Sequence, residues 1–263
     1  MFVGTTVRSP RESIEVAVLV DGQLQPLYRR PSDCDCKVTK FYVASELGKA
    51  YALQVRNLLS GRIEVITTVD GRHTLKDEPG DLNENRGLVF SAHQRGDFSG
   101  WQLDRQEARR FVFGQPERSI GAQATGQTSN IGVMGFGVYT ELSQHPLYEG
   151  YGTARGLSDD TLGGLESLGE PLGGTATRDG APAAYGAPAP VQGGSVGTGM
   201  GERIQNRLGS TNFSRSHMEP DILVIGYDTA EVLTRQGIIG PAAANPFPGI
   251  PTGYDKYRTI VGH

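Results

Sequence analysis

The fold class is decided by Arg62-Ile63-Glu64-Val65-Ile66-Thr67-Thr68-Val69-Asp70-Gly71. Nearly every residue between Ile63 and Val69 is β-branched or apolar, and β-branched side chains favour strands because they pack well on a pleated surface. An Asp-Gly pair follows at once, and this dipeptide favours a tight turn. The stretch therefore predicts a strand that ends in a turn.

The same pattern recurs on both sides of this stretch. Apolar residues alternate from Ile14 to Val20 before a second Asp-Gly pair at residues 21–22, with residues 24–28 as the returning strand. Further strand-length segments lie at residues 38–44, 51–55, 88–90, 111–113, 131–139 and 221–227. Short strands spaced by turn signals in this way predict a mainly β protein, with a single β-sandwich of the jelly-roll or immunoglobulin-like kind.

Two short helices are expected between or after the strands. Asp104 is followed three residues later by Glu107, which is the spacing of a capping box, so residues 104–110 are predicted to form one or two helical turns. Asp228 or Thr229 is expected to cap a second helix that ends at Gly237. The strand at residues 221–227 should rejoin the sandwich.

Composition divides the chain into four parts. Residues 1–12 are predicted to be an N-terminal arm, and residues 13–142 the β-sandwich. Residues 143–217 are predicted to be an extended strap or linker, because their Gly/Ala/Pro-rich centre offers little apolar side chain to bury. Residues 218–263 are predicted to contain a strand, a short helix and an extended, proline-containing tail.

Charge and hydropathy narrow the classes of partner. The formal net charge is -4 over 263 residues. Proteins that bind nucleic acid usually carry an excess of basic residues to neutralise phosphates, so nucleic acid is not an expected partner. No apolar run approaches the roughly 20 residues that span a bilayer. The first residues lack the charged start and apolar middle of a signal peptide. A membrane association is therefore not expected.

The two cysteines, Cys34 and Cys36, are separated by one residue. They supply half of the ligands that a tetrahedral zinc site needs, and two thiols so close in sequence form an internal disulfide poorly. Three states stay open for them: free thiols, disulfides between neighbouring subunits, and a metal site or internal bond.

Motifs for catalysis are weak throughout the sequence. The five histidines, at positions 73, 93, 145, 217 and 263, never stand at the spacing that places two imidazoles on one helix face. Residues 194–196 and 209–211 lack the second glycine of a serine nucleophile elbow. Residues 197–201 lack the Lys-Ser or Lys-Thr of a phosphate loop and are interpreted as linker glycine. The sequence therefore predicts no catalytic residue, no cofactor, no metal and no enzymatic activity.

Several short motifs together carry a resemblance. They are Val69-Asp70-Gly71, Gly100-Trp101, the Asp104 turn before Phe111-Val112-Phe113, residues 130–135, Tyr227-Asp228-Thr229, and the Pro-Phe-Pro of residues 246–248. On these, most of residues 13–142 and 220–250 resembles a family of poorly characterised β-sandwich proteins of bacteria and tailed phages. The sequence departs from that pattern in Asp33-Cys34-Asp35-Cys36 and in its long Gly/Ala/Pro segment.

The resemblance and the composition together favour a structural role. They predict a virion protein of a tailed phage, either a capsid decoration or a tail or neck component, which contacts capsid or tail proteins or copies of itself. Extended segments would bridge neighbouring subunits. The alternative is a carbohydrate-binding or adhesion module of a bacterial or phage surface protein, in which Trp101, Tyr139 or exposed tyrosines stack on sugar rings.

Overall fold

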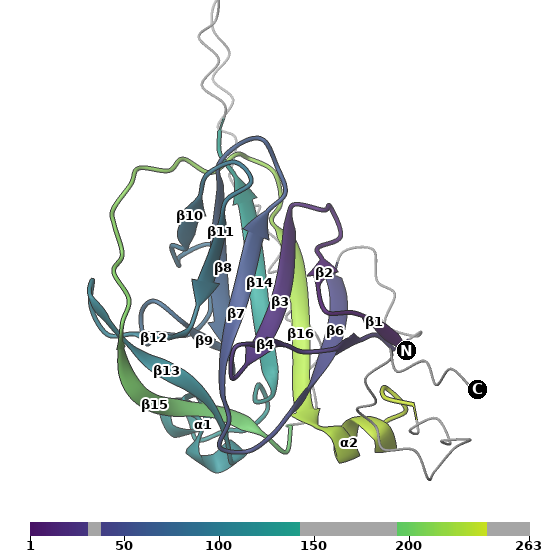
Figure 1. Ribbon diagram of the computed structural model, residues 1–263. Helices are drawn as coiled ribbons and strands as arrows, with labels where there is room; N and C mark the ends of the chain where they lie inside the picture. Colours follow the sequence, from purple (N-terminus) through teal and green to yellow (C-terminus); the bar gives the residue numbers. More distant parts are fainter. Residues whose placement is uncertain (31–37, 143–193, 241–263) are drawn as a thin grey trace, which may run out of the picture. The chain divides into compact units, whose positions relative to one another are not determined.

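The structure is a computed structural model, and it describes residues 1–30, 38–142 and 194–240. The described residues form two β-sheets with few and short helices, so the prediction of a mainly β, sandwich-like fold is confirmed (Figure 1). No helix among the described residues is long and apolar enough to cross a membrane.

The first sheet, sheet A, has its strands in the order β1-β5-β6-β16-β14-β8-β10, with β9 paired to β8. Neighbours are antiparallel except β6 and β16, which run parallel over eight residue pairs. The strands of sheet A are β1 (Phe2–Gly4), β5 (Leu27–Tyr28), β6 (Val38–Ser45), β16 (Asp221–Thr229), β14 (Val133–Thr140), β8 (Ile63–Val69), β10 (Leu88–Phe90) and β9 (Arg72–His73).

The second sheet, sheet B, has the order β12-β13-β7-β3-β2, with β11 paired to β7, β15 to β13 and β4 to β3. All of these pairs are antiparallel. The strands of sheet B are β12 (Gly100–Gln102), β13 (Glu107–Gly114), β7 (Ala50–Asn57), β3 (Ile14–Val20), β2 (Val7–Arg8), β11 (Arg95–Phe98), β15 (Gly197–Gln205) and β4 (Gln23–Leu24).

One hydrophobic core joins the two sheets. Alternate residues of most long strands point into it, as the period-two pattern of the sequence requires. Sheet B contributes side chains such as Leu53 and Phe111, and sheet A contributes Val65, Phe136 and Ile225. All five are essentially inaccessible to solvent. At about 25 cal/mol per Å² of apolar surface buried, this shared core supplies the main drive for the two sheets to pack.

Three short helices accompany the sheets: η1 (Pro116–Arg118), α1 (Ile120–Thr125) and α2 (Ala230–Arg235). The helix expected after residue 229 is confirmed, because the Thr229 side chain accepts a hydrogen bond from the Val232 amide and Gly237 has the positive φ of a helix stop. The strand that precedes it is also confirmed, and it lies inside sheet A between β6 and β14.

The helical turn expected after Asp104 is wrong. Oδ1 of Asp104 does accept hydrogen bonds from the amides of Gln106 and Glu107, at 2.7 and 2.9 Å. These bonds close the turn between β12 and β13, and Glu107 begins a strand. Local side-chain bonds from aspartate stabilise turns as readily as helix starts, so the spacing alone could not distinguish them.

The domain boundaries also differ from the expectation at two places. The first twelve residues are not a free arm, because β1 pairs with β5 and β2 pairs with β3, where Val7 is buried. Two strands of two or three residues carry no detectable alternation, which is why the sequence did not reveal them. In the expected strap, β15 pairs with β13, so at least residues 197–205 belong to sheet B.

The residues after β15 connect the two sheets. Figure 1 shows this green segment running from β15 to the opposite end of the sandwich, where β16 begins. There the Ser216 amide donates to the Thr140 carbonyl at 2.9 Å, and the Leu142 amide donates to the Ser214 carbonyl at 2.8 Å. This part of the expected strap is thus held against sheet A. The rest of it, residues 143–193, and the tail, residues 241–263, lie outside the described residues.

Substitution of Gly87 tests the contact between β10 and β8. A Cβ at Gly87 would lie 2.1 Å from the Val65 carbonyl oxygen, so Gly87→Ala should lower the free energy of unfolding by about 1–3 kcal/mol. At Gly61 a Cβ meets nothing within 4 Å, so Gly61→Ala should leave stability unchanged or raise it by less than about 1 kcal/mol. Urea denaturation of both variants measures the difference, and equal stabilities would contradict the close approach.

Candidate functional site

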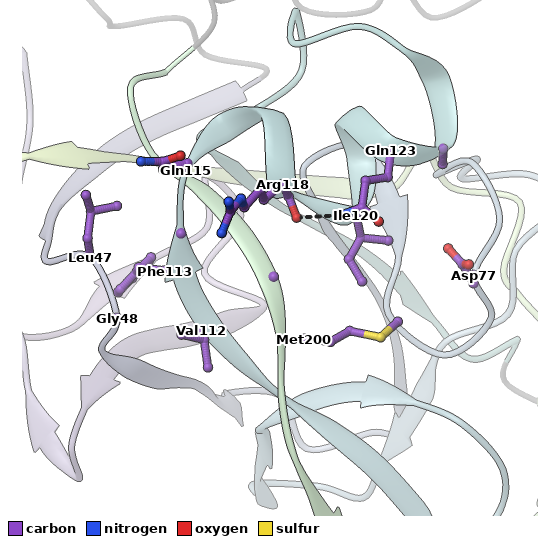
Figure 2. A pocket seen from close by; sticks show the side chains of 13 residues that line it. Leu47, Gly48, Asp77, Val112, Phe113, Gln115, Arg118, Ile120, Gln123 and Met200 are labelled. Carbon is purple, nitrogen blue, oxygen red and sulfur yellow. Dashed lines mark hydrogen bonds between the residues drawn. The ribbon is translucent and has the colours of Figure 1, made fainter.

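An open groove of about 880 Å³ lies where β13 ends and the chain turns into η1 and α1 (Figure 2). This volume is within the range of pockets that bind small molecules or short stretches of peptide. The lining is mostly apolar or glycine: Leu47, Gly48, Asp77, Val112, Phe113, Gly114, Gln115, Arg118, Ile120, Gln123, Ala124, Gly199 and Met200.

The helical wall of the groove is set by one capping residue. The Ser119 hydroxyl accepts a hydrogen bond from the Ala122 amide at 3.1 Å and donates to the Pro116 carbonyl at 2.7 Å. Ser119 therefore ends η1 and starts α1 at the same point. Gly126, with φ of 68°, ends α1 after six residues. The short helix projects Ile120 and Ala124 toward the groove.

The floor of the groove is flat because glycine occupies it on neighbouring strands. A Cβ at Gly114 would meet nothing within 4 Å, and one at Gly199 would make only ordinary contacts at 3.9 and 4.0 Å. Neither glycine has a positive φ. Since the backbone requires glycine at neither position, their effect is to leave the strand backbone uncovered.

Two charged side chains line the groove, and they differ in their partners. The Asp77 carboxylate is 2.7 Å from a guanidinium nitrogen of Arg72, which balances its charge. Arg118 is exposed, and among the residues that the structure describes its guanidinium has no acidic partner. In Figure 2 its side chain extends over the groove toward the strand that carries Val112 and Phe113. The groove therefore presents one uncompensated positive charge.

A buried polar network lies behind the groove and joins the two sheets. The Asp70 carboxylate accepts hydrogen bonds from the amides of Gly132 and Thr198, at 2.9 and 2.7 Å, and from the Tyr227 hydroxyl at 2.5 Å. The Thr198 hydroxyl lies 2.8 Å from the Tyr51 hydroxyl and 2.6 Å from that of Tyr227. The network fixes the start of β15, two residues before the groove.

Burial changes the titration of this network. Burial raises the pKa of Asp70 to about 6, and the hydrogen bonds that stabilise the charged form offset only part of that effect. The pKa values of Tyr51 and Tyr227 are raised well above 10 by burial and by the nearby Asp70 charge. Both phenols therefore stay protonated, and neither is a base at neutral pH.

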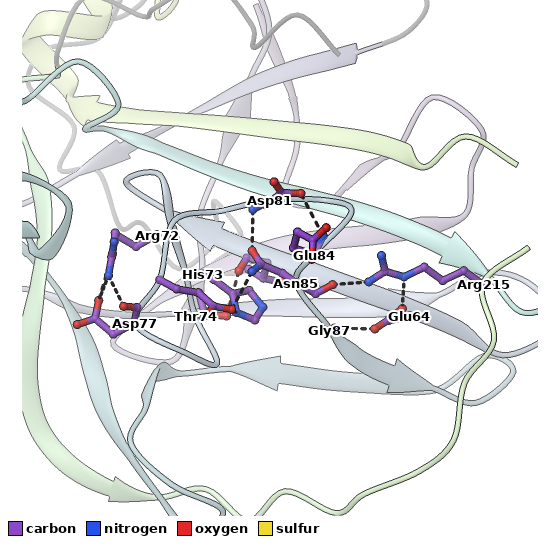
Figure 3. A network of polar contacts seen from close by, with 12 residues as sticks. Glu64, Arg72, His73, Thr74, Asp77, Asp81, Glu84, Asn85, Gly87 and Arg215 are labelled. Atoms are coloured by element: carbon purple, nitrogen blue, oxygen red, sulfur yellow. Dashed lines mark hydrogen bonds and ion pairs between the residues drawn. The ribbon is translucent and has the colours of Figure 1, made fainter. Parts of the chain in front are cut away.

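A second polar network covers the outer face of sheet A and is centred on Arg215 (Figure 3). The Arg215 guanidinium lies 2.7 Å from buried Glu64 and donates to the backbone carbonyls of Leu82, Asn83 and Asn85. It also lies 4.2 Å from the centroid of the Tyr139 ring. Arg215 thus holds the segment after β15, the loop at residues 81–87 and sheet A together.

The three histidines that the structure describes belong to no metal-binding group. His73 is buried on β9, where burial lowers its pKa, whereas His93 and His217 are exposed. His145 and His263 lie outside the described residues. Among the described residues, no group of three His, Cys, Asp or Glu side chains is placed to hold a metal ion. Cys34 and Cys36, the candidates for a disulfide between subunits, also lie outside them.

Two other expectations are changed by the structure. Residues 197–201, interpreted as linker glycine, are part of β15, where Thr198 is buried. Trp101 and Tyr139, proposed as platforms for sugar rings, are only 3% and 7% exposed. Trp101 instead packs edge-on against Phe111 in the core. These two aromatic rings cannot offer a face to a glycan.

The residues of the groove carry no signal that sequence reasoning could have used. Leu47 precedes β7, Arg118 lies on η1 after β13, and Met200 lies on β15; because β7 and β15 both pair with β13, the three residues come to one place. Comparisons of the chain with protein-family models, with curated proteins and with solved structures found no match.

The pH dependence of stability tests the Asp70 network. Its folded-state pKa, about 6, exceeds the ordinary 3.8, so the folded chain holds the proton more tightly than the unfolded chain. Protonation of Asp70 therefore stabilises the folded state fully below about pH 4, and this stabilisation is lost as the pH rises through about 6. The free energy of unfolding of the wild type, measured relative to Asp70→Asn, should fall by about 3 kcal/mol over this range.

The control for this experiment is Asp97→Asn, which alters an exposed carboxylate on β11. Because Asp97→Asn keeps Asp70, its free energy of unfolding should show the same fall with pH as that of the wild type. Urea denaturation at both pH limits gives these differences directly. A level profile relative to Asp70→Asn would show that the pKa of Asp70 is the same in the folded and the unfolded chain, and it would contradict the effect of burial.

Substitution of Arg215 tests the second network. Arg215→Gln leaves the Glu64 carboxylate, which is 2% exposed, without its closest countercharge, so we expect a loss of about 3–5 kcal/mol in the free energy of unfolding. The matched control is Arg86→Gln, because Arg86 is 64% exposed and lies 3.8 Å from the same carboxylate. It should cost less than about 1 kcal/mol. Similar losses for both variants would contradict the central place of Arg215.

Proposed function

We propose that this chain is a non-enzymatic structural and binding protein, and specifically a virion component of a tailed phage that bridges neighbouring subunits. The observation that carries the proposal is the groove of Figure 2, an apolar, glycine-floored surface held open by a rigid sandwich. Its lining offers apolar contact area and the charge of Arg118, which no acidic side chain of the described residues balances. Such a surface is suited to holding another chain.

The rigidity of the block supports this role. The core joins both sheets, the Asp70 network fixes the start of β15, and Arg215 fixes the segment that follows it. Because the residues of the groove are already held in place, little conformational entropy is lost when a partner binds, and this lowers the entropic cost of association. The virion assignment rests on the short motifs by which most of residues 13–142 and 220–250 resembles β-sandwich proteins of bacteria and tailed phages.

Bridging is assigned to the parts of the chain that are rich in glycine, alanine and proline. These are residues 143–193 and 241–263, which lie outside the described residues. Segments of this composition gain little by packing on themselves and can add contacts to a neighbour. Many weak contacts repeated around a shell or tube raise the overall affinity through effective concentration.

Mass spectrometry of purified phage particles from cells that express the chain tests the proposal. The wild-type chain should be present at a fixed ratio to the major particle protein. Gly199→Phe, which fills the groove, should be depleted from particles, and Gly209→Phe should be retained because Gly209 is exposed, outside the groove and has nothing within 4 Å of a Cβ. Absence of the wild-type chain from particles would reject the virion assignment.

A further inference from the structure

The groove has a charge that the described part of the chain does not balance. Arg118 is the only basic side chain in its lining, and the one acidic side chain, Asp77, is already paired with Arg72. An arginine beside an apolar surface gains most from a carboxylate, because its planar guanidinium can donate two parallel hydrogen bonds. The charge therefore favours an occupant that carries a carboxylate.

The rest of the lining requires apolar groups on the same occupant. Leu47 and Met200 are 51% and 44% exposed, although large apolar side chains of this kind are usually buried. Together with Val112 they flank the glycine floor on both sides. A free anion or a polyphosphate chain would leave the apolar side chains of the groove in water. A polyphosphate chain would also need more positive charges than the single arginine of the groove supplies. The occupant must be amphipathic.

The glycines of β13 and β15 leave room for the backbone of the occupant over sheet B. Within the described residues β15 pairs only with β13, so its other side is a sheet edge. Gly199 stands opposite Val112 and Met200 stands opposite Phe111, so consecutive residues of this edge point to opposite faces of the sheet. The groove reaches both positions. An extended peptide that lies across the groove can therefore contact β13 and β15 together and reach Met200 at the edge of the sheet.

We propose that the groove binds an extended peptide segment of a partner protein, in which an aspartate or glutamate follows closely on apolar residues. The carboxylate pairs with Arg118, and the apolar side chains pack on Leu47, Val112 and Met200. The peptide backbone runs close to Gly114 and Gly199, where any larger side chain would block it. This inference rests on the proposed binding function and names the chemistry of the partner.

Selection of short random peptides displayed on a carrier tests the inference, with the full chain as bait and Gly199→Phe as the counter-selection. The enriched peptides should share an acidic residue next to apolar ones. Gly114→Phe should also abolish their binding, since a side chain at Gly114 projects into open space. Thermal unfolding of both groove-filling variants should match that of Gly209→Phe, which shows that they fold.

The charge pairing is measured with the best selected peptide in two forms, the acid and its amide. Arg118→Gln should weaken the acid form about tenfold or more and leave the amide form unchanged. Arg95→Gln, on exposed Arg95 of β11, should change neither. Three results would overturn the inference: no enrichment, enriched peptides without a carboxylate, or equal effects of Arg118→Gln on both forms.

The two proposals can fail separately. Binding of selected acidic peptides without incorporation into particles would reject the virion role and keep the peptide site. If Arg118→Gln and Gly199→Phe are incorporated into particles as well as the wild type is, the virion role is kept. The contact with the particle then lies outside the groove.

Discussion

The buried carboxylate of Asp70 is the constraint that holds β14, β15 and β16 in position around the end of β8. It accepts hydrogen bonds from the start of β14, from β15 and from β16, three segments that lie far apart in the sequence. Its own residue ends β8 in a turn with φ of 50°. A buried carboxylate without these donors would cost several kcal/mol, so the donors have to return to this place when the chain folds.

This constraint positions the groove. The Thr198 amide is held by Asp70, and the next two residues, Gly199 and Met200, line the groove. The other wall depends on Ser119, whose single side chain ends one helical turn and begins the next. The charge of the groove therefore comes from exposed Arg118, whereas its shape comes from residues buried behind it. Arg215 adds a second fixed point on the far face of sheet A.

Local sequence patterns predicted the backbone conformation well wherever that conformation depends on neighbouring residues in the chain. The turn at Asp21-Gly22 has positive φ at both residues, at 49° and 79°, as the dipeptide indicates. The cap at Thr229 and the stop at Gly237 follow from side-chain and backbone preferences within one helical turn. Asp104 is the instructive exception, because its side chain makes the expected hydrogen bonds while the chain continues as a strand.

The amino-acid sequence by itself determined that this protein is mainly β, where most of its long strands run and how its last described helix begins and ends. These follow from alternation, β-branching and capping, which act over a few residues. Only the tertiary structure decided that β15 belongs to sheet B, that β16 lies parallel to β6 within sheet A, and that Arg118 faces a glycine floor. Such pairings join residues that are distant in sequence, and their free energy depends on surfaces that exist only after the core has formed.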